Sequence, residues 1–267
     1  MNTWLLLAQQ QISKPFYSRS GSLSILLCLL IWLLLLWYPV RKSAAALQNT
    51  GHTAGILNMF GLENLSYWAV PELGAYWALA LYLVPLFTLF IAADLFISDR
   101  QRGSLRFLLL RCSRLQLLSG RVTGQLAVQA GLILFSLLGA TLLAAVRLDN
   151  PLIIAQQLLL VMLCWLQLLI VVLPFILLMA LLSLRLNKVF NAVFIAALLF
   201  LLGDNLLHWL NQLLPGAAYL AYLIPGNQLS DMLNQMPQQS WSLLLWPVLQ
   251  SLVLGGGCWL TLRRQTL

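Results

Sequence analysis

Charged residues are scarce in this chain of 267 residues, of which only 8% are Asp, Glu, Lys or Arg. Soluble domains carry about 25% charged residues, so the chain has too little polar surface for a separate soluble domain. Hydrophobic residues make up 61% of the sequence, and the mean hydropathy is +0.88. Together these values predict an integral membrane protein.

Residues that bind metals or carry out catalysis are also few. The four cysteines lie far apart without a C-x-x-C pair, and His52 and His208 are isolated. This spacing favours small buried thiols over a metal site or a disulfide framework. The sequence contains no GxxxxGK[ST], HExxH or GxSxG motif, so it predicts neither an ATP site nor a reaction centre of its own. We therefore expect a chain that is not itself an enzyme and holds no metal or cofactor.

Long apolar stretches account for most of the chain and predict an all-α fold with six transmembrane helices. The predicted spans are 22–39, 73–93, 122–146, 152–182, 189–208 and 241–262. Residues 1–20 are amphipathic and predict an interfacial helix before the first span. Residues 204–240 are only partly apolar and rich in Pro and Gly, which predicts short outer helices or a re-entrant hairpin. The whole chain, 1–267, would form a single transmembrane domain.

The basic residues sort to one side of the predicted spans. Six spans place both termini on the same side, with twelve Lys and Arg residues on that side and three on the other. Cytoplasmic loops carry the excess of Lys and Arg, so both termini and segment 94–121 are predicted to be cytoplasmic. The net charge of +8 is thereby explained by topology, and we expect the lipid bilayer, not nucleic acid, as the surrounding partner.

Segment 94–121 is the one strongly charged stretch, with six of the twelve arginines and two of the seven acids. Within it Leu105, Leu108, Leu109, Cys112 and Leu115 recur at three- and four-residue steps, which indicates one helical face. Gly103 predicts a break between two short helices. Asp99 could interact with Arg102 or Arg106, and only weakly if the pair is exposed. Two interpretations stay open: a basic helix resting on anionic headgroups, or a coupling helix docked on a motor protein.

The same segment resembles the ABC-2 class of ABC-transporter permeases, including the NosY-like group. The resemblance rests on Asp94, Asp99, Gly103-Ser104-Leu105, Leu108-Leu109, Ser113-Arg114 and Gly120-Arg121, with the Gln-Gln-Gln-Ile-Ser-Lys stretch at 9–14 resembling the family's N-terminal elbow helix. The sequence departs from the family in three conservative replacements, Asp99, Ser104 and Arg121, and in lacking the family's Pro near Arg111-Cys112. The motif covers about a tenth of the chain, and the six-span plan covers its full length.

This resemblance implies a permease subunit that couples ATP hydrolysis by a separate cytoplasmic ATPase, which would hold the ATP and Mg, to export or to mechanical transmission across a bacterial inner membrane. It implies a second permease copy or a paralogue as partner, and an outer accessory protein as a further possible one. The residues it assigns to ATPase coupling are Asp94, Asp99, Arg102, Gly103, Ser104, Leu105, Arg106, Leu108, Leu109, Ser113 and Arg114. The cargo stays open. The alternatives are a self-powered secondary transporter and a membrane adaptor that transports nothing.

Overall fold

A computed structural model describes residues 3–17, 19–37, 68–147, 151–213, 222 and 224–264, and this part of the chain is helical without strands. The helices are α1 (Thr3–Tyr17), α2 (Arg19–Leu35), α5 (Pro71–Ile91), α6 (Ile97–Gln101), α7 (Ser104–Arg111), α8 (Arg114–Arg147), α9 (Pro151–Arg185), α10 (Val189–Leu213), α12 (Leu229–Leu233), the 3-10 helix η3 (Ser240–Leu244) and α13 (Leu245–Arg264).

Four of these helices are long and apolar enough to cross a membrane, which indicates a multi-pass membrane protein. They span Pro71–Ile91, Arg114–Arg147, Gln156–Arg185 and Ser240–Arg264. Each overlaps a span predicted from the sequence, although α8 begins eight residues before the predicted start at 122. The segment 114–121, predicted as part of a separate cytoplasmic piece, is therefore the first two turns of a long helix.

The other two predicted spans correspond to shorter apolar helices within the described residues. The apolar part of α2 is Gly21–Leu35, and that of α10 is Val189–Phe200. Fifteen helical residues extend about 22 Å, less than the roughly 30 Å of a bilayer core. The structure therefore supports four spans, and the count of six remains a prediction.

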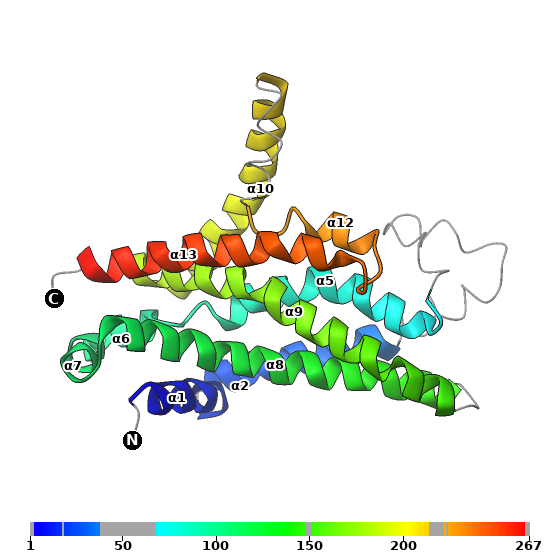
Figure 1. The fold of residues 1–267 in the computed structure, drawn as a ribbon. Coiled ribbons are helices and arrows are strands. Elements are labelled where there is room, and N and C mark those ends of the chain that lie inside the picture. The colour runs from blue at the N-terminus through cyan, green and yellow to red at the C-terminus, as the bar shows by residue number, and fades with distance from the viewer. Residues whose placement is uncertain are drawn as a thin grey trace.

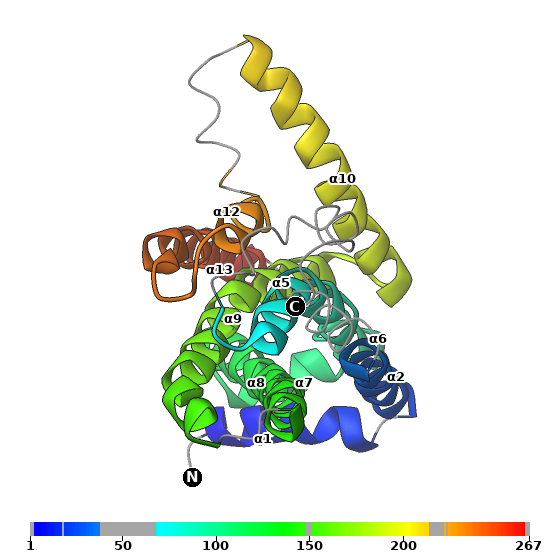
Figure 2. The same ribbon diagram turned by 90° about the vertical axis from the view of Figure 1, so that its right-hand side faces the viewer.

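α5, α8, α9 and α13 lie alongside one another and form the bundle (Figure 1). α1 lies crosswise at one end, where it packs against α8, while α10 leaves the bundle at a steep angle (Figures 1 and 2). α6, α7, α1 and the C-terminal end of α13 share that end of the molecule, which we call the basic end. The helix α12 lies within the predicted outer segment, 204–240, and η3 begins at its last residue. Residues 214–221 and 223 of that segment lie outside the described residues.

Two apolar clusters stabilise this arrangement. The larger one runs through the bundle around side chains such as Tyr76, Leu137 and Ile176. The smaller one, at the basic end, joins Leu7 of α1 and Leu105 of α7 to residues of α8, α9 and α13. The second cluster fixes the charged segment to the ends of the spans.

Candidate functional site

The predicted coupling segment folds as two short helices separated by a turn at Gly103. Gly103 has a φ of 70°, a left-handed conformation that glycine adopts without the strain of a side chain. It follows Arg102, the C-cap residue of α6, and directly precedes α7, so the predicted break at this position is present. The turn lets α7 leave the direction of α6 and reach the outer surface of the basic end.

Asp94 ties the end of α5 to α1 and to α6. Its carboxylate lies 3.2 Å from Lys14 Nζ, and Lys14 also donates to the Asp94 carbonyl at 2.8 Å. The same carboxylate accepts hydrogen bonds from the backbone and hydroxyl of Ser98, at 3.0 and 2.6 Å. Because Ser98 lies in the first turn of α6, where backbone N–H groups lack intrahelical partners, Asp94 anchors that helix as well as α1.

Asp99 pairs with Arg121, and not with Arg102, which is one of the two partners that the sequence suggested. Arg121 lies 22 residues away on α8 and is only 2% exposed, and its Nη2 contacts Asp99 Oδ2. A buried guanidinium requires a charged partner, whereas Arg102 is exposed to solvent. The side chain of Arg106 lies outside the described part of the structure. The turn at Gly103 brings α8 back past α6, and this return makes the distant pair possible.

Arg121 also connects the segment to α1. Its Nη1 donates to Gln11 Oε1 at 2.8 Å, and Gln11 Nε2 donates in turn to Gln125 Oε1 at 3.2 Å. The Ser104 hydroxyl lies 3.4 Å from Asp99 Oδ1 and donates to the Asp99 carbonyl at 3.2 Å. We call the group formed by Gln11, Asp99, Ser104, Arg121 and Gln125 the clamp. It joins α1, α6, α7 and α8 through side chains that are mostly buried.

Two glycines of α8 allow α1 to come close enough for the clamp to form. A Cβ atom at Gly120 would lie 2.9 Å from Leu7 Cβ, and one at Gly124 would lie 2.7 Å from the Ala8 carbonyl oxygen. Small residues four positions apart let helix backbones approach each other closely, as in membrane helix pairs. Only Gly120 belongs to the motif described from the sequence, and the four-residue spacing of Gly120 and Gly124 is the signal that identifies this contact.

Side chains of the segment also cap the ends of two spans. Arg100 donates to the Leu184 carbonyl in the last turn of α9, and Gln101 donates to the Asn187 carbonyl at 2.6 Å. Arg114 donates to the Arg263 carbonyl in the last turn of α13 at 2.7 Å. The last carbonyls of a helix lack intrahelical partners and carry partial negative charge, so cations are favourable there. Arg100 and Gln101 were not among the predicted coupling residues.

The outer surface of α7 carries exposed apolar side chains. Leu105 is buried, while Leu108, Leu109 and Cys112 are partly buried against the smaller cluster. Phe107 and Leu110 point away from the protein and are 71% and 84% exposed. Neither was predicted, because the sequence pattern selected a different set of residues. Four of that set lie against the protein, but the fifth, Leu115 at the start of α8, is 62% exposed. Ser113 lies in the turn before α8, where its hydroxyl accepts a hydrogen bond from the Gln116 N–H.

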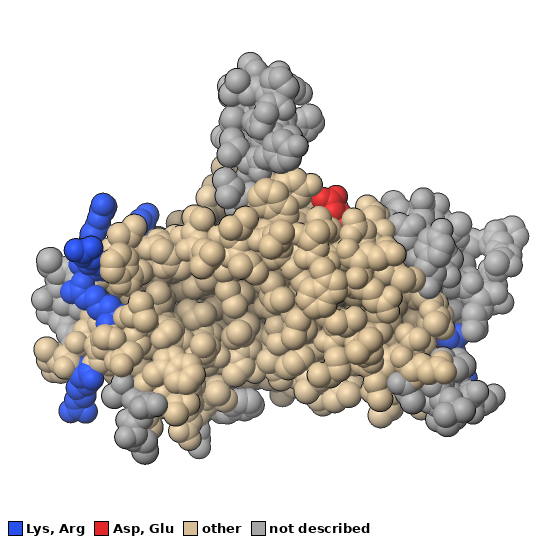
Figure 3. All heavy atoms as spheres, viewed as in Figure 1, with Lys and Arg blue, Asp and Glu red and all other residues tan. Residues whose placement is uncertain are grey.

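Basic residues surround this apolar tip. Arg102 and Arg111 are exposed at the ends of α6 and α7. On the face drawn in Figure 3, most Lys and Arg side chains gather at the basic end, and the broad middle of that face shows none. Burial raises the pKa of the nearby Cys112 thiol, an effect that the charge of Arg121 partly opposes. The thiol also donates to the Leu108 carbonyl at 3.0 Å.

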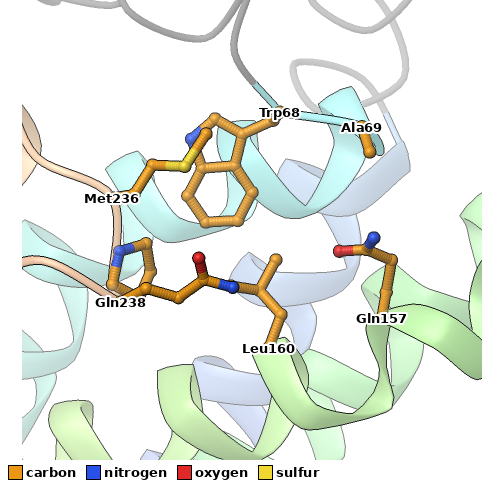
Figure 4. Close-up of a pocket in the computed structure, with 7 residues that line it drawn as sticks. Trp68, Ala69, Gln157, Leu160, Met236 and Gln238 are labelled. Atoms are coloured by element: carbon orange, nitrogen blue, oxygen red, sulfur yellow. The ribbon is translucent and has the colours of Figure 1, made fainter.

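The opposite end of the bundle has its own polar contacts. Arg147 at the end of α8 pairs with Glu72 in the first turn of α5, and Glu72 is only 2% exposed. Nearby, a cavity of about 160 Å³ is lined by Trp68, Ala69, Gln157, Leu160, Met236, Pro237 and Gln238 (Figure 4). All seven lining residues are uncharged. The parts of the chain that the structure describes contain no group of three His, Cys, Asp or Glu residues placed to hold a metal ion.

Comparison of the chain with protein-family models and with curated proteins gave no match.

Proposed function

We propose that this chain is the membrane-spanning permease subunit of an ABC transporter, driven by a separate cytoplasmic ATPase that docks on α7. The observation that carries the proposal is the exposed pair Phe107 and Leu110, placed at the basic end of a bundle with four candidate spans. Two large apolar side chains on a helix flanked by exposed arginines form a surface that a protein partner would cover.

The charges around this pair define the partner. Arg102 and Arg111 flank the apolar tip, so a complementary surface has an apolar cleft with acidic residues at its rim. Excess Lys and Arg mark the cytoplasmic side of a membrane protein, which is where an ATPase would bind. The ABC-2 resemblance of segment 94–121 supports the same partner, since the family's coupling helix lies at this position. Export or mechanical transmission across a bacterial inner membrane, with a second copy or a paralogue, follows from the same resemblance.

The contacts that segment 94–114 makes with the rest of the chain support a role as a lever, in preference to a helix that only rests on headgroups. Asp94, Asp99 and Arg114 connect it to α1, α8 and α13, so a force on α7 would act on several spans together. Headgroup binding alone would require basic residues facing the lipid and no such internal connections. Rigid-body motion of packed helices is a common form of conformational switching.

Phe107 and Leu110 provide the test. The tagged chain is purified in mild detergent from its native membrane with Phe107→Ala and Leu110→Ala combined, and the co-purifying ATPase and its activity are measured against wild type. Phe190→Ala serves as the matched control, because Phe190 is 77% exposed on a different helix, α10. We expect loss of the ATPase from the double variant alone.

Three other results would identify another class of protein or another docking site. A wild-type preparation without any ATPase would refute the permease proposal and favour a self-powered transporter. An ATPase that binds but whose turnover never responds to a transported molecule would favour an adaptor. Retention of the ATPase by the double variant would show that α7 is not its docking site.

A further inference from the structure

Helix α9 makes specific polar contacts at two levels that are far apart along its axis. At the basic end, Arg100 and Gln101 of α6 donate to the Leu184 and Asn187 carbonyls at and just after its C-terminus. These two hydrogen bonds join α6 directly to α9. Any displacement of α6 therefore changes the position of the last turn of α9 or breaks both contacts.

Gln167 makes the second contact, toward the opposite end. Its Nε2 donates to the Pro237 carbonyl at 2.5 Å, and its Oε1 accepts from the Ser240 hydroxyl at 3.3 Å. Gln167 is completely buried within a strongly apolar helix, and a buried amide is costly unless it is hydrogen-bonded. An apolar side chain would suit packing better here, so the glutamine serves to hold segment 236–240.

The part of α9 between these contacts is tightly packed. Leu184 comes seventeen residues after Gln167, which corresponds to about 26 Å of helix. Most side chains in this stretch are buried, including Leu168, Val171, Val172, Ile176, Met179 and Ala180. Pro174 removes one helical hydrogen bond within this stretch. Close-packed interiors nevertheless deform little and transmit displacement, so we expect the stretch to move largely as one body.

The segment held by Gln167 forms one wall of the cavity at the opposite end. Figure 4 shows Met236 and Gln238 on that segment facing Trp68 and, from α9 itself, Gln157 and Leu160. The cavity therefore has three walls, formed by residues 68–69, by α9 and by residues 236–238. Two of them depend on α9, one directly and one through the hydrogen bond from Gln167 to Pro237. A shift of α9 changes the shape of this cavity.

We propose that α9 couples the position of α6 at the basic end to the shape of the cavity at the opposite end, with Gln167 as the positioning residue. In the permease proposed above, this would link the ATPase side to the outer side through a single helix. Only the direction of the signal, from the ATPase side to the outer side, rests on the proposed function. The contacts that would carry the signal all lie within this chain.

The test measures access to the cavity. Gln238, which is exposed at its rim, is changed to Cys in a Cys112→Ser background, where the remaining cysteines, Cys28, Cys164 and Cys258, are buried. The chain is reconstituted in lipid nanodiscs and the rate of maleimide labelling is recorded. Combining Arg100→Ala with Gln101→Ala is expected to change this rate by about fivefold or more, the lower range of coupling between sites.

Gln167→Leu and Arg102→Ala distinguish coupling from general loosening. With Gln167→Leu present, the Arg100 and Gln101 changes should no longer affect the labelling rate, because the connection to Pro237 is lost. Arg102→Ala removes an exposed arginine next to Gln101 and should leave the rate unchanged.

Three results would overturn the proposal: an unchanged labelling rate in the double variant, an effect that persists with Gln167→Leu, or an equal effect of Arg102→Ala. Should the double variant fail to insert, Gln101→Ala alone replaces it, since that side chain is exposed and its loss removes one of the two contacts. The labelling rate is measured on the isolated chain, so it does not depend on ATPase docking. Failure of docking would leave the coupling through α9 intact, and failure of the coupling would leave the docking proposal intact.

Discussion

Replacing Gly124 by Ala tests whether the close packing of α1 on α8 positions the clamp. The new Cβ would lie 2.7 Å from the backbone oxygen of Ala8 and 2.7 Å from Gln11 Cβ. An ordinary contact begins at 3.4 Å, so α1 must move away by the difference, 3.4 minus 2.7, or about 0.7 Å. The obstructing atom belongs to the backbone, so no side-chain rotation can relieve the contact.

This displacement has a direct effect on the clamp. The hydrogen bond from Arg121 Nη1 to Gln11 Oε1 measures 2.8 Å, and adding about 0.7 Å takes it beyond the range of a hydrogen bond. Overpacking of this kind costs about 1–3 kcal/mol, against which Ala gains about 0.5–1 kcal/mol of helix propensity over Gly. The difference is about 0–2.5 kcal/mol, with a middle value near 1 kcal/mol, so we expect α1 to open about five times more often.

Hydrogen exchange of the backbone amides of α1, measured in nanodiscs, reports this opening. Gly131→Ala is the matched control, because Gly131 lies on the same helix and no atom lies within 4 Å of its ideal Cβ. Exchange in α1 should accelerate with Gly124→Ala and stay as in wild type with Gly131→Ala. Equal exchange in the two variants would refute the argument that close backbone approach holds α1 in place.

Three further perturbations test the ion pairs and the thiol. Arg121→Leu should lower the free energy of unfolding by about 3 kcal/mol because it leaves Asp99 without its partner, and adding Asp99→Leu should recover part of that loss. If the effects of the two substitutions are simply additive in denaturant titration, the two side chains do not form a direct pair. Glu72→Gln should destabilise the chain by about 2 kcal/mol by leaving Arg147 without its partner, and the thermal midpoint should recover when Arg147→Gln is added; no recovery would argue against the pair. Because the pKa of Cys112 is raised, a smaller fraction of its thiol forms thiolate at a given pH than in an ordinary cysteine. Alkylation of Cys112 should therefore be slower than that of a free thiol at pH 8, and it should accelerate with rising pH. Alkylation as fast as that of a free thiol at pH 8 would contradict its burial.

Hydropathy predicted the long spans because a helix in lipid must be apolar along its whole length. The break at Gly103 was predicted from the glycine itself, because the chain needs there a conformation suited to glycine. The shorter helices α2 and α10 were harder to assign. Their apolar stretches within the described residues, 21–35 and 189–200, are too short to span by themselves, and composition alone does not fix where a helix leaves the bundle.

The contacts of the candidate site could not be predicted in the same way, since they depend on how distant segments return to one another. Asp99 meets Arg121 only because α7 reverses the path of the chain between them. Arg100 caps α9 because that helix happens to end beside α6. Phe107 and Leu110 were missed for a related reason, because an apolar residue on an apolar helix does not reveal which face the rest of the protein covers.

The segment from Asp94 to Arg114 combines two properties that a mechanical link requires. Its inner side is fixed to α8 by the ion pair of Asp99 with Arg121, a buried charge that would be costly to leave unpaired. A hydrogen bond from Arg114 also fixes it to α13. Its outer side presents Phe107 and Leu110 without cover from the described part of the chain. A helix that only rested on headgroups would need the exposed side but not the fixed one, and a purely structural helix would need the fixed side but not the exposed one. The presence of both on one short helical segment is what favours a lever that a separate protein moves.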